Sequence, residues 1–418
     1  MKQSIYTHIM VMALAGLLFM ACEDDPTVPF YNIKKVSATV NKIDIPEEMK
    51  QENTVQNTSP FYLFSTETEA YFLADVYVDR STEQKLNGPA IYTFTAATKT
   101  WKRVWRALSQ QEIEMMRNEE YTAAADERQA KEEAVETEYQ RKYELLSPDD
   151  MEGLNALNTE RQKQLNEIEN KWQLKYEEIS IKYEEMQSVS YVYDVFRNIL
   201  NNNYNEPDSN IACLYNNRGY IRTDNYIYTF NLQTNEITLH KETSYGDIRN
   251  GVFFVNEAGF HVLYGNNIRD LLMGSDTYLP TIGSYSPSNT FLIGNQIYSY
   301  NGKYCRIISL SSLQVTEEKE FVLPGYEGNG YVDNMGSQST RYLKSSFVLG
   351  GKMYLKDFQY FYALTSGQTE GQLFDFNAAY EAIIQQSMGG EPDRSFFAIG
   401  SKLYTWPQGA SYIFEIPL

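Results

Sequence analysis

The chain carries two different patterns of hydrophobic and polar residues. Over most of its length, short runs of Ile, Val, Tyr, Phe and Thr are separated by segments rich in Gly, Asn, Asp and Ser. This pattern is typical of many short antiparallel strands joined by turns. Between Ser109 and Gln187 the composition changes to Glu, Gln, Lys, Arg and Ala, with almost no Gly or Pro. The sequence therefore predicts a mainly β protein with one long helical insertion.

Within residues 109–187, hydrophobic residues recur three and four positions apart, as on one face of a coiled-coil helix. The stripe breaks at Ser147-Pro148, where Ser147 is suited to cap a helix and Pro148 to occupy its first position. We therefore expect a long antiparallel hairpin that folds at this point. Such a fold places Trp172 opposite the small residues around Ala124, which would allow the two helices to pack closely.

A repeat centred on tyrosine runs through the β regions. The segment Ile91-Tyr92-Thr93-Phe94 returns as Ile227-Tyr228-Thr229-Phe230. The tyrosines that mark the repeat are Tyr92, Tyr228, Tyr298, Tyr354 and Tyr404. When the helical segment is left out, their spacing is close to the length of a four-stranded propeller blade. We expect these tyrosines to fill the layer between blades, and we expect Gly to allow the backbones to approach closely near the axis.

The order of a hydrophobic run, Gly, Tyr and then Thr-x-x-Trp resembles degenerate kelch repeats. Gly350-Gly351 followed by Tyr354 is the nearest local match, and Thr98 with Trp101 supplies the other half of the motif. The resemblance implies a β-propeller of about six blades that covers residues 60–106 and 190–418. A jelly roll or β-sandwich is the structural alternative, but neither fold predicts a repeat of this kind.

The N-terminal residues resemble the export signal of a lipoprotein. Lys2 is followed by an uninterrupted hydrophobic run of 12 residues, Ile9 to Met20, which is too short to span a bilayer and suits a signal peptide. Ala21-Cys22 then resembles the lipobox of bacterial lipoproteins, although Phe19 replaces the usual Leu. The resemblance implies that Cys22 is lipidated. The alternative is an ordinary secretory signal with an incidental cysteine.

Three acidic residues, Glu23, Asp24 and Asp25, follow the cysteine directly. They resemble the outer-membrane retention and surface-export signals of lipoproteins in the Bacteroidota. The resemblance implies a lipid-anchored protein of the outer membrane on the cell surface, with the periplasmic face as the alternative. The same acids would also keep a short tether solvated.

These patterns divide the chain into five segments. The expected segments are a signal peptide at 1–21, a lipidated tether at 22–32, a closing strand with the first blade at 33–108, the helical hairpin at 109–187 and the remaining blades at 188–418. Hydrophobic and polar residues alternate within 33–45, so this stretch is expected to pair with the last strand of the chain and close the ring.

Charge narrows the range of partners. The chain has 36 Lys and Arg against 55 Asp and Glu, a net charge of −19. Such a chain, without a basic cluster, is expected to repel phosphate backbones, so nucleic acid is not a predicted partner. Residues 109–187 hold 21 acidic and 10 basic residues, a net charge of −11, which is more than half of the total excess. A solvated helical surface explains these charges, and a binding role is the alternative.

The sequence offers no catalytic, metal-binding or cofactor-binding pattern. It lacks the Asp-box of sialidase-like propellers, a nucleophile elbow, a P-loop, a dinucleotide fingerprint and an EF-hand. His240 and His261 fall in strand-like runs, where a packed or surface histidine is the commoner case. The turn-like carboxylates are Asp224, Asp276, Asp333 and Asp393. We therefore predict no catalytic residue, metal or cofactor.

Two cysteines remain beyond the signal segment, Cys213 and Cys305. An oxidising compartment permits a disulfide between them, but they lie in different repeat units, so we expect two free buried thiols.

The leading functional hypothesis is a non-enzymatic interaction or scaffold protein within an outer-membrane complex, where the hairpin or the ring face contacts an envelope protein. Glycan binding or cleavage by the ring is the first alternative, since the many Tyr rings would stack on sugars. The second alternative is a periplasmic outer-membrane assembly factor, because the chain resembles the periplasmic propeller lipoprotein of that machinery.

Overall fold

The computed structural model describes most of the chain from residue 34 onward. The described residues are 34–49, 60–76, 88–202, 211–223, 225–242, 251–280, 285, 290–301, 304–320, 331–332, 338–339, 345–357, 360–364, 372–387, 396–407 and 410–418. Cys22 and the acidic residues Glu23, Asp24 and Asp25 lie outside them. No helix in these ranges combines the length and the hydrophobicity needed to cross a bilayer.

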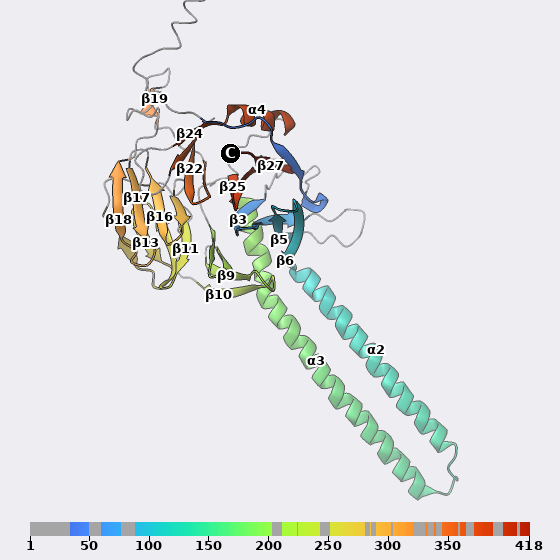
Figure 1. The fold of residues 1–418 in the computed structure, drawn as a ribbon. Coiled ribbons are helices and arrows are strands. Elements are labelled where there is room, and N and C mark those ends of the chain that lie inside the picture. Colours follow the sequence, from blue (N-terminus) through green and yellow to red (C-terminus); the bar gives the residue numbers. More distant parts are fainter. Residues whose placement is uncertain are drawn as a thin grey trace, which may run out of the picture.

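The structure is mainly β, and most of its strands form antiparallel four-stranded sheets in which each strand pairs with the next along the chain (Figure 1). The first sheet contains β3 (Phe61–Ser65), β4 (Glu69–Val76), β5 (Gly88–Thr95) and β6 (Thr100–Arg106). The second contains β7 (Ala212–Tyr215), β8 (Arg218–Arg222), β9 (Tyr226–Asn231) and β10 (Ile237–Glu242). The third contains β11 (Val252–Asn256), β12 (Gly259–Tyr264), β13 (Asn267–Asp270) and β14 (Asp276–Tyr278). The fourth contains β15 (Thr290–Ile293), β16 (Gln296–Tyr300), β17 (Tyr304–Ser309) and β18 (Val315–Glu320).

The last two large sheets each take in a strand from the N-terminal segment. The fifth contains β21 (Ser345–Leu349), β22 (Lys352–Asp357), β23 (Tyr360–Leu364) and β24 (Gln372–Asp375), with β1 (Lys34–Lys35) parallel to β24. The sixth contains β25 (Phe396–Ile399), β26 (Lys402–Thr405) and β27 (Tyr412–Ile416), with β2 (Asn41–Asp44) antiparallel to β27. The described residues also include the strand pair β19 (Tyr331–Val332) and β20 (Gln338–Ser339) and the short helices η1 (Glu47–Met49) and α4 (Asn377–Gln386).

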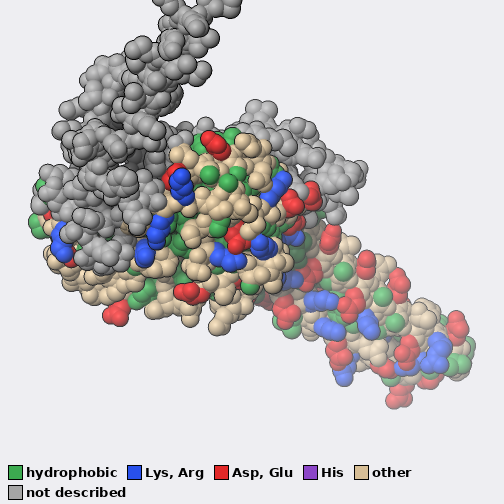
Figure 2. All heavy atoms as spheres, turned by 45° about the horizontal axis from the view of Figure 1, so that its top comes forward, with side chains coloured by type: hydrophobic (Ala, Val, Ile, Leu, Met, Phe, Trp, Pro, Cys, Tyr) green, Lys and Arg blue, Asp and Glu red, His purple; other side chains and the backbone are tan. Residues whose placement is uncertain are grey.

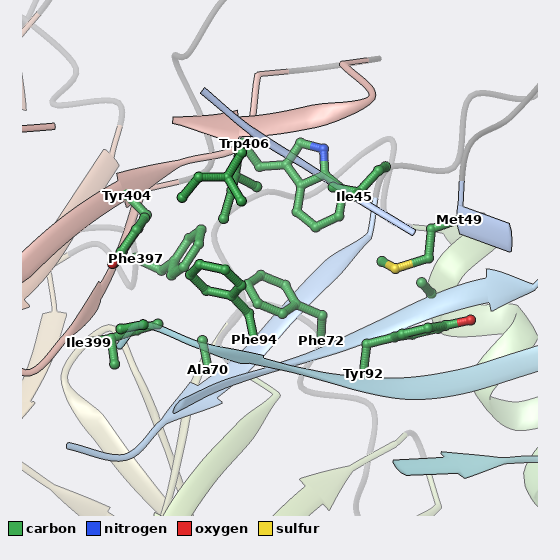
Figure 3. Packing of buried hydrophobic residues seen from close by; sticks show 14 of the residues in the cluster. Ile45, Met49, Ala70, Phe72, Tyr92, Phe94, Phe397, Ile399, Tyr404 and Trp406 are labelled. Carbon is green, nitrogen blue, oxygen red and sulfur yellow. The ribbon is translucent and has the colours of Figure 1, made fainter. Parts of the chain in front are cut away.

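Each of these sheets packs on the next, and the sixth packs on the first. Separate clusters of buried hydrophobic side chains lie between sheets one and two, two and three, three and four, four and five, and five and six. A further cluster joins Phe72 and Phe94 of the first sheet to Phe397 and Tyr404 of the sixth (Figure 3). Strand β2 lies in the 33–45 stretch where the alternating pattern predicts a closing strand.

The glycines of the repeat serve the turns rather than close packing near an axis. Gly350 and Gly351 join β21 to β22 with φ values of 57° and 70°, the left-handed geometry that a tight two-residue hairpin turn requires. A Cβ on either glycine would meet nothing within 4 Å. The expectation of close backbone approach is therefore wrong at these two positions. Gly400 also lies in a turn, between β25 and β26, and there a Cβ would lie 3.0 Å from the carbonyl oxygen of Glu67.

The five repeat tyrosines are all buried, but they do not occupy one structural position. Tyr298, Tyr354 and Tyr404 lie on the second strand of their sheets, opposite Phe291, Phe347 and Phe397 of the first strand. Tyr92 and Tyr228 lie on the third strand of the first and second sheets. The sequence repeat thus combined two structural positions, because both strands carry a buried tyrosine that follows Ile, Leu or Met.

The helical segment leaves the first sheet after β6 and returns before β7, so that two long helices lie side by side and project away from the sheets (Figure 1). They are α2 (Gln110–Tyr143) and α3 (Met151–Asn202). The chain turns at residues 144–150, as the break in the stripe predicts. Asp150 accepts the Gly153 N–H at 2.9 Å, so it caps α3 in place of Ser147. Helix α3 also runs past residue 187.

The β2–β27 pairing predicts a stability contribution from the N-terminal segment. Ile43 is 7% exposed and lies opposite Ile413, so Ile43→Ala should lower the free energy of unfolding by about 2 to 5 kcal/mol. Asn41 on the same strand is exposed, and Asn41→Ala should change it by less than about 0.5 kcal/mol. Urea unfolding curves measure both values. Equal stability of the two variants would mean that β2 is not part of the cooperative fold.

Candidate functional site

The pair of helices α2 and α3 with the turn between them, called the rod below, is the feature that stands furthest from the sheets. Helix α2 has 34 residues, which corresponds to about 51 Å at 1.5 Å per residue. A simple connection between neighbouring sheets needs only a few residues. The length of the rod is therefore not explained by the need to connect two sheets. Its contacts differ between the end at the sheets, called the base, and the turn at the far end.

At its base, the last turns of α3 are buried between the first and second sheets. Val192, Phe196 and Leu200 belong to the same cluster as side chains of β3, β4, β5, β8 and β9. The Phe196 ring contacts Trp105 and Tyr228 at centroid distances of 5.7 and 5.5 Å. Because these three α3 residues are spaced by four, they fall on one face of the helix. This spacing of four could have predicted that the helix continues, but the three residues lie beyond the predicted helical segment, 109–187.

A polar contact fixes the other helix to the first sheet. The Glu112 carboxylate accepts hydrogen bonds from the Arg106 guanidinium of β6 and from the Ser109 backbone N–H, both at 2.8 Å. The Ser109 hydroxyl accepts the Glu112 N–H in return at 3.2 Å, which completes a capping box. Glu112 is 8% exposed, so this charge pair is largely shielded from salt. Both helices are therefore attached firmly where they leave the sheets.

In the proximal half of the rod, a hydrophobic cluster joins the two helices. Trp172 is 1% exposed and donates its indole N–H to the carbonyl oxygen of Ala124 at 2.8 Å. Ile113, Ile179 and Tyr183 complete the buried set. The structure thus brings Trp172 and Ala124 together at the position that folding about residues 147–148 predicts.

Ion pairs flank this cluster. Glu120 accepts hydrogen bonds from Lys182 at 2.6 Å and from the Tyr183 hydroxyl at 2.9 Å, and Glu127 accepts one from Lys175 at 2.7 Å. The bond from Lys182 lowers the pKa of Glu120, and the bond from Lys175 lowers the pKa of Glu127. Both carboxylates therefore remain charged at neutral pH.

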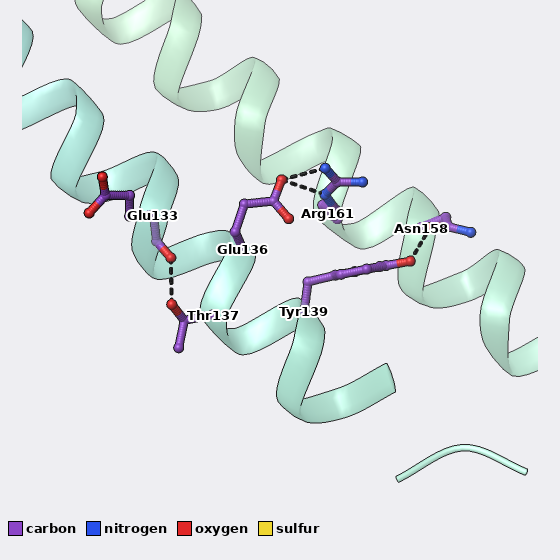
Figure 4. A network of polar contacts seen from close by, with 6 residues as sticks. All are labelled: Glu133, Glu136, Thr137, Tyr139, Asn158 and Arg161. Atoms are coloured by element: carbon purple, nitrogen blue, oxygen red, sulfur yellow. Dashed lines mark hydrogen bonds and ion pairs between the residues drawn. The ribbon is translucent and has the colours of Figure 1, made fainter. Parts of the chain in front are cut away.

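In the distal half, the two helices contact each other mainly through polar side chains (Figure 4). Glu136 pairs with Arg161, the Tyr139 hydroxyl donates to Asn158 at 2.9 Å, and Lys142 lies 3.0 Å from Glu160. An open groove of about 640 Å³ runs beside this network. Its lining residues are Gln129, Glu132, Glu133, Glu136, Thr137, Gln162, Leu165, Asn166 and Glu169. Exposed pairs of this kind contribute little stability, so the distal half is the weaker part of the rod.

Of the candidate residues on the sheets, the structure describes Asp276, His240 and His261, and each of these has its own separate surroundings. Asp224, Asp333 and Asp393 lie outside the described residues. Asp276 forms a two-bond pair with Arg269 at 2.7 and 2.8 Å, which lowers its pKa. His240 is exposed on β10. Among the residues that the structure describes, no group of three His, Cys, Asp or Glu side chains is placed to hold a metal.

His261 occupies the position on β12 that a tyrosine occupies in the later sheets. It lies opposite Phe254, and the two rings stack at 5.3 Å, as Tyr354 stacks on Phe347 at 4.9 Å. Its Nε2 lies 3.0 Å from the Asn256 amide oxygen, and the side chain is 2% exposed. Burial lowers the pKa of His261, so the ring is neutral at physiological pH. Packing therefore explains this histidine.

Cys213 and Cys305 are free thiols and do not pair; Cys213 is buried as expected, whereas Cys305 is only half-buried. Burial raises the pKa of both, that of Cys305 to about 12, so neither is an activated nucleophile at neutral pH.

The buried histidine predicts a dependence of stability on pH. Because the pKa of His261 is lower in the folded than in the unfolded chain, the unfolded chain takes up the proton first as the pH falls through about 6.5. Stability should therefore decline from pH 7.5 to pH 5.5. His261→Phe keeps the ring stack without the titrating group and should reduce the decline, whereas exposed His240→Gln should not. Urea unfolding at both pH values measures this, and an unchanged decline in His261→Phe would contradict it.

Comparison with known proteins leaves the family open. No protein-family model matches the chain, and no curated protein matches it. Among solved structures, the extracellular domain of a hybrid two component system from B. thetaiotaomicron is similar over 49% of this chain and 26% of that one, at 11% identity and a TM-score of 0.29. PorZ, a surface component of the type-IX secretion system of Porphyromonas gingivalis, is similar over 49% and 32%, at 10% identity and a TM-score of 0.22. AztD from Citrobacter koseri is similar over 39% and 46%, at 8% identity and a TM-score of 0.25. Likenesses of this size assign no function.

Proposed function

We propose that the protein is a lipid-anchored interaction protein of the bacterial cell envelope, in which the rod docks a protein partner and the sheets serve as its platform. The observation that carries this proposal is the attachment of the rod. Val192, Phe196 and Leu200 of α3 are buried between two sheets. The Arg106–Glu112 ion pair attaches the other helix, α2, to the first sheet. A projecting pair of helices gains a fixed direction from such a base, which suits presentation of a surface at a distance.

For the platform, we propose a six-bladed propeller. Its support is the succession of four-stranded antiparallel sheets, each packed on the next within the described residues, and the pairing of β2 with β27. The first strands of neighbouring sheets also contact one another, as β3 does with β7 and β21 with β25. In a propeller, closure by an N-terminal strand would make the ring one cooperative unit, which is the property that the Ile43→Ala comparison measures.

The anchoring part of the proposal comes from the sequence. A hydrophobic run that ends in Ala21-Cys22, followed by Glu23-Asp24-Asp25, favours lipidation of Cys22 and placement of the protein on the outer face of the outer membrane. Lipid chains hold a protein at a bilayer by about 0.8 kcal/mol per buried CH₂, and more than one chain is needed for stable anchoring.

The anchor predicts a simple fractionation result. The parent protein should pellet with outer membranes and incorporate labelled palmitate, whereas Cys22→Ser should lose the label and most of its membrane association. Ser4→Ala, within the signal segment, is the control and should change neither. Membrane pelleting of Cys22→Ser at the level of the parent would contradict the anchor.

The rod predicts the location of partner binding. Glu127 and Asn170 lie at matching distances from the turn, so residues 128–169 can be replaced by a short Gly-Ser linker that leaves the Trp172–Ala124 contact and the base intact. The shortened protein should fold with unchanged sheet stability and should lose association with its envelope partners. Co-purification from native membranes, quantified by mass spectrometry, measures the loss. Unchanged association would remove the rod from the function and leave the faces of the sheets as the binding surface.

A further inference from the structure

The distal end of the rod exposes large hydrophobic side chains. Tyr143, Leu145 and Met151, which flank the turn between α2 and α3, are 49%, 79% and 62% exposed. Leu145 is the most exposed large hydrophobic residue among those that the structure describes. Figure 2 shows hydrophobic side chains together with acidic and basic ones at this end of the rod. These three residues are called the tip below.

The fold uses the hydrophobic residues at the tip only in part: the Tyr143 ring stacks on Tyr139 at 6.1 Å, but Leu145 and Met151 are mostly exposed. The turn is held by backbone hydrogen bonds, from Leu145 N–H to the Lys142 carbonyl and from Leu146 N–H to the Tyr143 carbonyl, and by the Asp150 cap. Polar residues such as Ser or Asn form the same bonds and are favoured in turns. Leu146, which packs near Gly153, already supplies the local hydrophobic contact. An exposed group of hydrophobic residues at the end of a projecting element is typical of an interaction surface.

The charges around the tip narrow the choice of partner. Residues 141–152 contain two basic residues, Arg141 and Lys142, and four acidic ones. Lys142 is already engaged by Glu138 and Glu160 at 3.1 and 3.0 Å. The tip is therefore hydrophobic with a negative rim, and the distal rod behind it is acidic as well. A second copy of this rod or an anionic membrane would be repelled by this charge.

We propose that the tip inserts into a hydrophobic pocket of a partner protein whose rim carries Lys and Arg. This proposal rests on the docking role of the rod and assigns that role to three side chains. Interfaces draw most of their affinity from a few buried large side chains, with Tyr among the favoured types. A charged rim adds association rate and specificity that fall with salt.

The matched control lies elsewhere on the rod, away from the turn. Leu174 and Ile181 on α3 are 62% and 51% exposed, close to the values at the tip, but they lie in the proximal half of the rod. A photo-crosslinking amino acid in place of Leu145 should therefore form one discrete adduct with a partner protein in intact native cells, and the same probe in place of Leu174 should not. Adducts of equal yield at both positions, self-adducts, or none at the tip would overturn the proposal.

Mass spectrometry of the adduct identifies the partner. The Kd and the association rate are then measured with the purified partner. The triple variant Tyr143→Ser, Leu145→Ser, Met151→Ser should weaken the Kd by about tenfold or more. The double variant Leu174→Ser, Ile181→Ser should leave it within about twofold of the parent. Raising NaCl from 50 to 300 mM should slow association with the parent. Equal loss in both variants, or binding of the parent to phosphatidylcholine vesicles that the triple variant lacks, would contradict a protein pocket at the tip.

A shortened rod separates this proposal from the docking role itself. Deleting residues 128–141 and 156–169 removes equal lengths from both arms and the acidic groove, keeps the tip, and shortens the rod by about 21 Å. This variant should bind the purified partner with a Kd close to that of the parent. If it loses binding while the tip triple variant retains it, the rod docks through its shaft and the tip proposal fails. If replacement of residues 128–169 leaves association with the partner unchanged, the docking role of the rod is itself wrong.

Discussion

The burial of the C-terminal turns of α3 between the first and second sheets is the contact on which the rest of the molecule depends. Val192, Phe196 and Leu200 fill the space that neighbouring sheets elsewhere fill with their own side chains. The helix is therefore part of the core, and the direction of the rod is set by the packing of the sheets. Gly88 shows how tight this joint is, since a Cβ there would lie 2.6 Å from the Tyr193 ring.

From this joint outward, the contacts between the two helices change in kind. Close to the sheets, Trp172 and its neighbours form a dry cluster with a hydrogen bond to Ala124. Further out, Glu136–Arg161 and Tyr139–Asn158 hold the helices through exposed polar groups. At the end, hydrophobic residues return but face solvent. Stability thus belongs to the base, and the surface chemistry suited to a partner belongs to the far end.

Much of this arrangement follows from sequence periodicity. The change in composition at Ser109, the break at residues 147–148 and the large-against-small pairing of Trp172 with Ala124 are local patterns with a direct geometric meaning. The end of α3 was missed because Val192, Tyr193 and Phe196 are residues that favour strands, and only packing against two sheets makes them helical here. The tyrosine repeat treated residues on second strands and residues on third strands as equivalent. Sequence spacing alone does not show which strand of a sheet carries a buried ring.

The central claim is that the rod keeps one fixed direction relative to the sheets. Pulsed electron resonance between spin labels at Ser147→Cys, near the tip, and at exposed Thr238→Cys on β10 measures this directly in a Cys22→Ser chain. Cys213 is buried, which raises the pKa of its thiol and keeps it unlabelled, and the half-buried Cys305 is replaced by Ala in the same chain. A rod fixed by the α3 joint predicts one narrow distance distribution. A broad or multimodal distribution would show that the rod pivots at its base and would contradict the account.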